Sequence, residues 1–206
     1  MKAVIAIVVV LVIALLVFGS YIGAKNQMVA KNETVKSKWA QVDVVLQRRA
    51  DLIPNLVETV KGIASQEQVV FGDIAKARSA LLSANTPTDK IAANQQLDGA
   101  IGRLLLIVEN YPQLKSSENF LRLQDELAGT ENRIAVERKN YNDSLQDYNT
   151  FIGQFPNSVW AGMAGFKRNE AYFAASEASR QTPKVDFSGV KPNAPAKTAP
   201  QPAPAH

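Results

Sequence analysis

An uncharged stretch at the N-terminus constrains this chain more than any other feature. Residues 3–24 contain no charged side chain and lie between two lysines. As a helix the stretch would extend about 33 Å, enough to cross a hydrocarbon core of about 30 Å. Thirteen positions from Val4 to Phe18 are Val, Ile, Leu or Phe, which favours insertion by roughly 4–8 kcal/mol. We therefore expect residues 1–24 to form a transmembrane anchor that contacts the lipid bilayer through residues 3–24.

A cleaved signal peptide is the alternative interpretation of the same stretch. Lys2 would be its basic region, and Ala24 is a small residue before a cleavage point. However, the apolar run up to Phe18 slightly exceeds the usual signal core, and Tyr21 lies where an interfacial aromatic would anchor a retained helix. We expect a retained, single-pass helix.

The flanking lysines bear on the orientation of this helix. One lysine precedes the apolar stretch, whereas four follow it, at Lys25, Lys31, Lys36 and Lys38. Because basic residues collect on the cytoplasmic side, the count favours a cytoplasmic body. An exported body stays open, since it would suit the short amino tail and the Pro/Ala-rich C-terminus.

Apolar side chains follow a helical period after the anchor. Spacings of three and four over residues 35–63 predict one long amphipathic helix. No Pro or Gly interrupts residues 25–38, so we expect the anchor to continue into this helix. The pattern resumes beyond Gly62, which extends the predicted helix to about Leu82, with a bend near Pro54.

Two further long helices are predicted downstream. One covers residues 88–109, and the other begins at the capping residue Ser117 and ends at Phe155-Pro156. The turns between the long helices are short and polar, which favours antiparallel packing. One or two short helices within residues 157–180, the second over Ala171–Ser179, would complete the bundle.

These elements predict an all-α fold: a transmembrane helix, then an antiparallel bundle of three long helices and one or two short ones over residues 25–187. Residues 188–206 contain five prolines and no large apolar residue after Val190. Such a tail cannot bury enough surface to fold, so we expect it to be disordered.

The composition argues against most catalytic chemistry. The chain has no cysteine, and its only histidine, His206, ends the tail, so a nucleophile would lack the usual imidazole base. No phosphate loop, paired-histidine zinc motif or calcium loop is present. A net charge of +4 is too weak to indicate nucleic acid. We predict no catalytic residue, no metal and no cofactor, and an enzyme based on carboxylates is the least favoured class.

Arg49 is the one charged residue on the apolar stripe of the first long helix. A charge on a packed face must be paired and hydrogen-bonded. Asp51, two positions away, points elsewhere on the helix, so we expect a Glu of the second or third helix, either Glu109 or Glu137, as the partner. The pair is interpreted as a buried salt bridge that fixes helix register, with a ligand or partner site as the alternative.

Three tyrosines each adjoin an asparagine, in the pairs Asn110-Tyr111, Tyr141-Asn142 and Tyr148-Asn149. We interpret the tyrosines as core residues whose hydroxyls reach the rim, and the asparagines as partners of neighbouring backbone. The apolar but small-residue-rich segment from Val159 to Phe166 is a candidate for lying on a membrane or packing against another subunit.

Several sequence blocks carry a family resemblance. They are Arg48–Val57, which contains Pro54 and Asn55, Glu109–Pro112, Glu118–Phe120, Thr130–Ile134, Tyr141-Asn142, Tyr148-Asn149 and Val185–Phe187. On these blocks the chain resembles the LemA family of bacterial membrane proteins, over about residues 20–187. The resemblance implies one N-terminal helix in the bacterial inner membrane and a body of long antiparallel helices, with no established enzymatic role or cofactor. Some magnetosome membrane proteins look like relatives, which points toward membrane organisation or remodelling.

We therefore expect a noncatalytic membrane-bound scaffold of coiled-coil-like helices that binds a protein partner or copies of itself. An accessory subunit that docks on a membrane protease or signalling system is the alternative. The candidate structural or partner-site residues are Arg49, Asp51, Pro54, Asn55, Glu109, Tyr111, Glu137, Tyr141 and Tyr148.

Overall fold

The computed structural model describes residues 1–174, and this part of the chain is helical without strands. Its helices are α1 (Lys2–Lys61), α2 (Gln68–Ser83), α3 (Pro87–Val108), α4 (Pro112–Lys115), α5 (Glu118–Gly153) and α6 (Asn157–Ala164). The all-α prediction is confirmed. The predictions for residues 175–206, including the disordered tail, lie outside the described residues.

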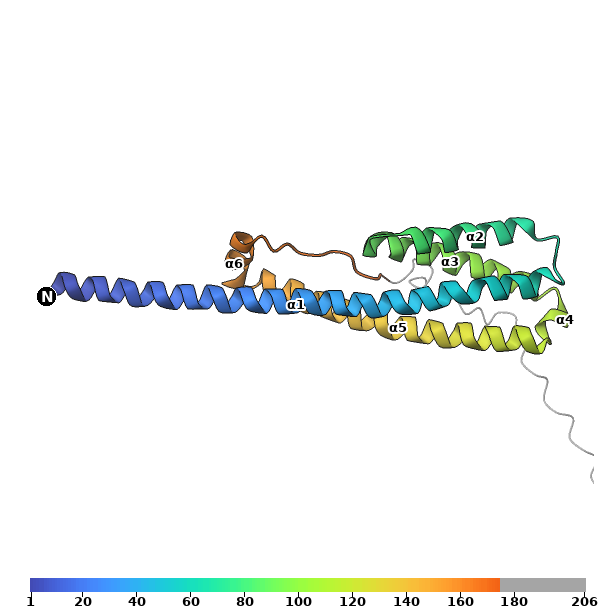
Figure 1. The fold of residues 1–206 in the computed structure, drawn as a ribbon, viewed down its shortest axis with the longest axis horizontal. Helices are drawn as coiled ribbons and strands as arrows, with labels where there is room; N and C mark the ends of the chain where they lie inside the picture. The colour runs from blue at the N-terminus through green and yellow to red at the C-terminus, as the bar shows by residue number, and fades with distance from the viewer. Residues whose placement is uncertain (175–206) are drawn as a thin grey trace, which may run out of the picture. The chain divides into compact units, whose positions relative to one another are not determined.

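Helix α1 runs without a break from the apolar stretch into the body. Its N-terminal part is long and apolar enough to cross a membrane, and none of the side chains in that part is buried. Burial begins at Ala24 and includes Met28 and Val35. At 60 residues, α1 is about 90 Å long. Figure 1 shows the N-terminal part of α1, which contains the candidate membrane span, projecting beyond the other helices.

Helices α1 and α5 form the most extensive helix–helix contact of the body. Both bury every seventh residue over a long stretch, a repeat typical of helices that wrap around each other with a left-handed twist. In α1 these residues are Met28, Val35, Val42, Arg49 and Leu56, and in α5 they are Phe120, Leu127, Ile134, Tyr141 and Tyr148.

Contacts along this pair show that the two helices are antiparallel. Lys31 pairs with Asp147 at 2.6 Å, the rings of Trp39 and Tyr141 lie 5.2 Å apart, and Arg49 lies 3.0 Å from Glu131. The α1 number rises while the α5 number falls, so the pairing keeps one register over this length. Figure 1 shows the two helices running side by side.

The predicted continuation of the first helix to Leu82 is wrong, because α1 ends at Lys61 and α2 begins at Gln68. The amide of Gly62 still donates to Glu58 O at 3.2 Å, and that of Ala64 to Val60 O at 2.8 Å, after which the chain leaves the helix. The body thus has four long helices rather than three. Pro54 lies inside α1 and does not end it.

Helices α2 and α3 form a hairpin that packs on the distal part of α1. The residues of α2 that continued the apolar pattern, Phe71, Ile74, Ala77 and Leu81, are buried. The Arg78 side chain of α2 donates from Nε to the carbonyl of Ala50 in α1 at 2.8 Å. The spacing of the apolar residues therefore predicted which side chains are buried, but it did not reveal that they belong to two separate helices.

Side-chain caps define where α3 and α5 begin. Thr86 accepts a hydrogen bond from the amide of Asp89 at 3.1 Å, and Pro87 occupies the first turn of α3. Ser117 accepts from the amide of Phe120 at 3.2 Å, which confirms the predicted cap of α5. The first predicted short helix is α6. Residues 171–174 are not helical, and the rest of the second predicted short helix lies outside the described residues.

Candidate functional site

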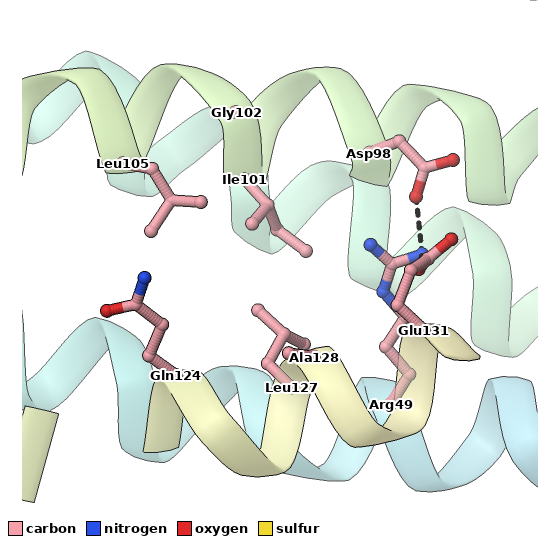
Figure 2. Close-up of a pocket in the computed structure, with 9 residues that line it drawn as sticks. All are labelled: Arg49, Asp98, Ile101, Gly102, Leu105, Gln124, Leu127, Ala128 and Glu131. Atoms are coloured by element: carbon pink, nitrogen blue, oxygen red, sulfur yellow. Dashed lines mark hydrogen bonds and ion pairs between the residues drawn. The ribbon is translucent and has the colours of Figure 1, made fainter. Parts of the chain in front are cut away.

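A cluster of charged and polar side chains lies where α1, α3 and α5 meet. We call it the charged cluster; its members are Arg49 of α1, Asn94 and Asp98 of α3, and Glu131 and Arg138 of α5. Arg49 occupies a seven-residue-repeat position of α1, so helical periodicity directs it inward. Its neighbours reach it from two other helices, and Figure 2 shows Asp98 and Glu131 converging on its guanidinium.

The cluster balances a deeply buried charge through one end of the Arg49 guanidinium, while Arg49 Nε has no hydrogen-bond partner among the described residues. Arg49 is 5% exposed. Its Nη1 donates to Asp98 Oδ1 and, at 3.2 Å, to Asn94 Oδ1, and lies 3.0 Å from Glu131 Oε2. Arg138 Nη2 lies 3.7 Å from Asp98 Oδ2. Two guanidinium groups thus face two carboxylates, which leaves the cluster electrically neutral.

Neither expected partner of Arg49 belongs to this cluster. Glu109 is exposed and pairs with Lys115 at 2.7 Å, while Glu137 accepts a hydrogen bond from Asn140 at 3.2 Å. The reason is the level at which the helices cross: the middle of α3, not its C-terminal end, lies beside Arg49, and α5 presents the residue six positions before Glu137. That level depends on tertiary packing, which the sequence pattern of one helix does not contain.

The other predicted residues of the first helix lie away from the charged cluster. Asp51 is exposed and accepts a hydrogen bond from Gln47 at 3.0 Å, consistent with its expected direction. Pro54 and Asn55 are also exposed. Tyr111 is half-buried beside α4, in the turn that follows α3. The structure therefore brings Arg49 together with none of these residues.

An open groove of about 370 Å³ extends from the charged cluster between α3 and α5. Arg49, Asp98 and Glu131 lie at one end of this groove (Figure 2). Beyond them, Ile101 of α3 faces Leu127 of α5, and Leu105 of α3 faces Gln124 of α5, as Figure 2 shows. Its floor and walls are mainly apolar, so the groove suits an apolar side chain or helix face more than a charged metabolite.

An aromatic cluster of Trp39, Tyr141 and Phe173 lies on the other side of Arg138. Ring centroids are 5.2 Å apart for Trp39 and Tyr141, and 6.0 Å for Tyr141 and Phe173. The guanidinium of Arg138 lies 5.0 Å from the centre of the Phe173 ring, a cation–π geometry. Arg138 therefore links the charged and aromatic clusters.

Tyr141 is 1% exposed, and its hydroxyl has no hydrogen-bond partner among the described residues. Burial, and then the neighbouring Tyr172, raise the pKa of this hydroxyl above its ordinary value of 10.0. Tyr148 is also buried, and burial raises its pKa too. Its hydroxyl donates to Lys167 O at 3.0 Å. The two tyrosines thus differ in whether the hydroxyl is satisfied.

Asn142 and Asn149 bind a backbone segment that is distant in sequence rather than neighbouring backbone. Asn149 donates to Asn169 O at 2.7 Å and accepts from Asn169 N at 2.9 Å. Asn142 makes the same pair of bonds with Phe173, at 2.9 and 3.0 Å. Because the two asparagines are seven residues apart on α5, they lie on one face and hold residues 169–173 along it. Two asparagines seven residues apart were the sequence feature from which a bound backbone segment could have been predicted.

The described residues define an all-α protein with a candidate membrane span and a helical body whose buried charges are paired. The sequence profile of the LemA family matches residues 38–187. The chain belongs to the LemA family.

Similar curated proteins include magnetosome and LemA proteins. Magnetosome protein MamQ of Magnetospirillum gryphiswaldense is 30% identical over 72% of this chain and 64% of its own length. Magnetosome protein MamQ 2 of Paramagnetospirillum magneticum is 29% identical with the same coverage. Protein LemA of Metamycoplasma hominis is 26% identical over 78% of this chain and 73% of its own length. The chain thus spans about 64% of the length of the magnetosome relatives.

The neutrality of the charged cluster gives a stability prediction. Arg49→Leu should lower the free energy of unfolding by about 3 kcal/mol, near the lower end for breaking a buried pair, because both carboxylates are partly exposed. The double variant Arg49→Leu/Glu131→Leu restores charge balance and should recover most of that loss. Urea unfolding of the detergent-solubilised protein measures both. Equal destabilisation of the single and double variants would show that charge balance is not the source.

The unsatisfied hydroxyl of Tyr141 gives a pH prediction. Above pH 10 an unfolded tyrosine loses its proton while Tyr141 keeps it, so the folded state binds more protons and stability falls as pH rises through the raised pKa. Tyr141→Phe should be within about 1 kcal/mol of the parent at pH 7, since no hydrogen bond is lost. It should also lose less stability above pH 10.

Tyr148→Phe is the comparison for the pH 7 part of this measurement, because the Tyr148 hydroxyl has a hydrogen-bond partner and that of Tyr141 has none among the described residues. Burial raises the pKa of Tyr148 as well, so this variant should also lose less stability above pH 10. It removes the bond to Lys167 O and should cost about 0.5–1.5 kcal/mol at pH 7. Thermal unfolding of the three proteins between pH 7 and pH 11 measures these differences. An alkaline loss that is identical in the parent and Tyr141→Phe would contradict the assignment.

Proposed function

We propose that this protein is a noncatalytic, membrane-anchored helical scaffold that binds a protein partner or copies of itself. The observation that carries this proposal is the continuity of helix α1. One unbroken helix contains both the candidate membrane span and the part of α1 that packs against α5. A continuous helix fixes the distance and direction of the body relative to the membrane. Such a construction suits a protein that holds other components in place.

Contacts at the end of the candidate span support its retention. The rings of Tyr21 and Trp160 meet edge to face at 5.7 Å, and Ala24 is buried. Cleavage after Ala24 would remove Tyr21 and its contact with Trp160. It would also cut α1 at the residue where its packing against the body begins. We therefore propose that residues 1–24 remain in the mature protein and anchor it in the bacterial inner membrane.

The chemistry of the charged cluster supports a noncatalytic role. Asp98 contacts both arginines of the cluster, and Glu131 lies against Arg49. A general acid or base must exchange a proton with a substrate, whereas these carboxylates already balance two buried or half-buried guanidinium groups. Fixing the register of three helices is the role that this geometry supports.

The similarity to the magnetosome proteins named MamQ supports a place in membrane organisation. The similarity covers most of this chain but about 64% of those proteins. We propose by analogy that this chain organises membrane-associated components through its helical body.

An accessory subunit is the second candidate, and the groove between α3 and α5 favours it. An apolar groove between two helices can receive the apolar face of a partner helix. In that case the protein would dock on a distinct membrane protein, such as a protease or a signalling system, in a fixed ratio.

Crosslinking of the full-length protein in its native membrane, followed by native mass measurement, separates the candidates. A scaffold should give large assemblies containing several copies, whereas an accessory subunit should give one complex with a distinct protein at fixed ratio. Monodisperse monomer without partners would contradict both.

A pair of matched variants tests whether a docked partner uses the groove. Ala128 lines the groove on α5, and Ala40 is exposed on α1 outside it. Ala128→Trp should fill the groove and abolish the complex with the distinct protein, while Ala40→Trp should leave it intact. Equal yields of complex from both variants would exclude the groove as the docking face.

The lysine count provides the proposed orientation, with the body in the cytoplasm. Lys25, Lys31, Lys36 and Lys38 all follow the span on the body side. A pair of reporters fused after Lys197, one active only in the cytoplasm and one active only outside it, reads the orientation. Activity of the cytoplasmic reporter is expected, and activity of the external reporter would reverse the assignment.

A further inference from the structure

The turn before α6 and the helix itself expose three large apolar side chains. Phe155 is 85% exposed, Met163 is 70% exposed and Val159 is 49% exposed. Val159 and Met163 are four residues apart and lie on one face of the helix. Ala161 on the opposite side of the helix is buried against the body, and Trp160, beside the exposed face, is half-buried. An apolar face is therefore left uncovered on a helix that is otherwise docked.

Helix α6 lies beside the part of α1 where the exposed apolar stretch ends and burial against the body begins. Trp160 contacts Tyr21 at 5.7 Å between ring centroids, only three residues before burial begins at Ala24. Figure 1 shows α6 crosswise to α1 at this level. If α1 crosses a bilayer, a helix crosswise to it lies along the membrane plane, as amphipathic helices at the interface do.

Contacts at and beyond its C-terminus hold α6 in place. At its C-terminus Gly165 adopts a left-handed conformation with φ 78°, and the amide of Phe166 donates to Ala161 O at 3.0 Å. The following chain is bound by Asn149 through Asn169. The exposed face of α6 is thus fixed relative to the end of the span.

The charges and aromatics around α6 match a lipid surface. Lys25 and Lys167 are exposed near this level, where they can approach anionic headgroups. Arg168 is also exposed but pairs with Glu170 at 3.2 Å. Tyr21 and Trp160 are the residue types enriched at the membrane–water interface. A second copy of the chain fits less well, because three side chains cannot supply the roughly 800 Å² per partner that a stable protein interface buries.

From this placement we propose that Phe155, Val159 and Met163 insert into the same bilayer that α1 spans, so that α6 forms a second membrane contact. The span would then enter the membrane vertically while α6 rests in the headgroup region beside it. This inference rests on the proposed anchoring of residues 1–24, and its test reads the two contacts separately.

The chain contains no native cysteine, so single cysteines can carry an environment-sensitive fluorophore without background. The full-length variants Val159→Cys and Met163→Cys report on α6, and Val10→Cys reports on the span. Val136→Cys, on α5 and 57% exposed, is the matched control for an exposed apolar position in the body. Each is reconstituted in vesicles of phosphatidylcholine and phosphatidylglycerol that carry nitroxide-labelled acyl chains.

The nitroxide-labelled lipid should quench the fluorophores at positions 10, 159 and 163. The fluorophore at position 136 should be quenched only by a second, water-soluble quencher added outside the vesicles. If 159 and 163 behave like 136 while 10 is quenched by lipid, the inference is wrong and the anchoring stands. If 10 is not quenched by lipid either, the anchoring itself fails. Protection of 159 and 163 that grows with the protein-to-lipid ratio, without lipid quenching, would assign this face to a second copy instead.

Discussion

The antiparallel pairing of α1 with α5 is the contact on which the rest of the structure depends. Most of the stability of a helix within a protein comes from packing its apolar face against other elements, and each of these two helices buries its seven-residue repeat where they contact each other. The α2–α3 hairpin, α6 and the backbone of residues 169–173 all pack on one or both of them. The pair therefore acts as a frame to which every other described element is attached.

Among the described residues of this frame, Arg49 is the one buried charged residue, and it limits the freedom of the two helices to shift against each other. Two helices paired only through apolar residues can shift by seven residues relative to each other, because each repeat buries similar side chains. A shift of that size would carry Arg49 away from Asp98 and Glu131 and leave buried charge without compensation. The charged cluster thus distinguishes one register from its neighbours, and it ties α3 to the same register.

Features that repeat along one helix could be predicted from the sequence, whereas features that join helices could not. The uncharged stretch, the buried face of α1 and the Ser117 cap follow from local spacing and composition. The break after Lys61 was missed because residues 69–81 continue the same period in a new helix. Glu109 and Glu137 were wrong partners for Arg49 because the level of a crossing is a tertiary property, and the contacts of Asn142 and Asn149 with residues 169–173 were hidden for the same reason.

The unbroken length of α1 makes it a lever. About 55 Å of helix extend from Lys25 to Lys61 beyond the candidate span. A change in tilt of about 20°, within the range that membrane helices show as bilayer thickness varies, would sweep the far end of this arm by roughly 19 Å. A rotation of the span about its helix axis would also rotate Arg49, because α1 is one continuous helix without a flexible break between them. Local changes in bilayer thickness would thereby become displacements of the distal hairpin.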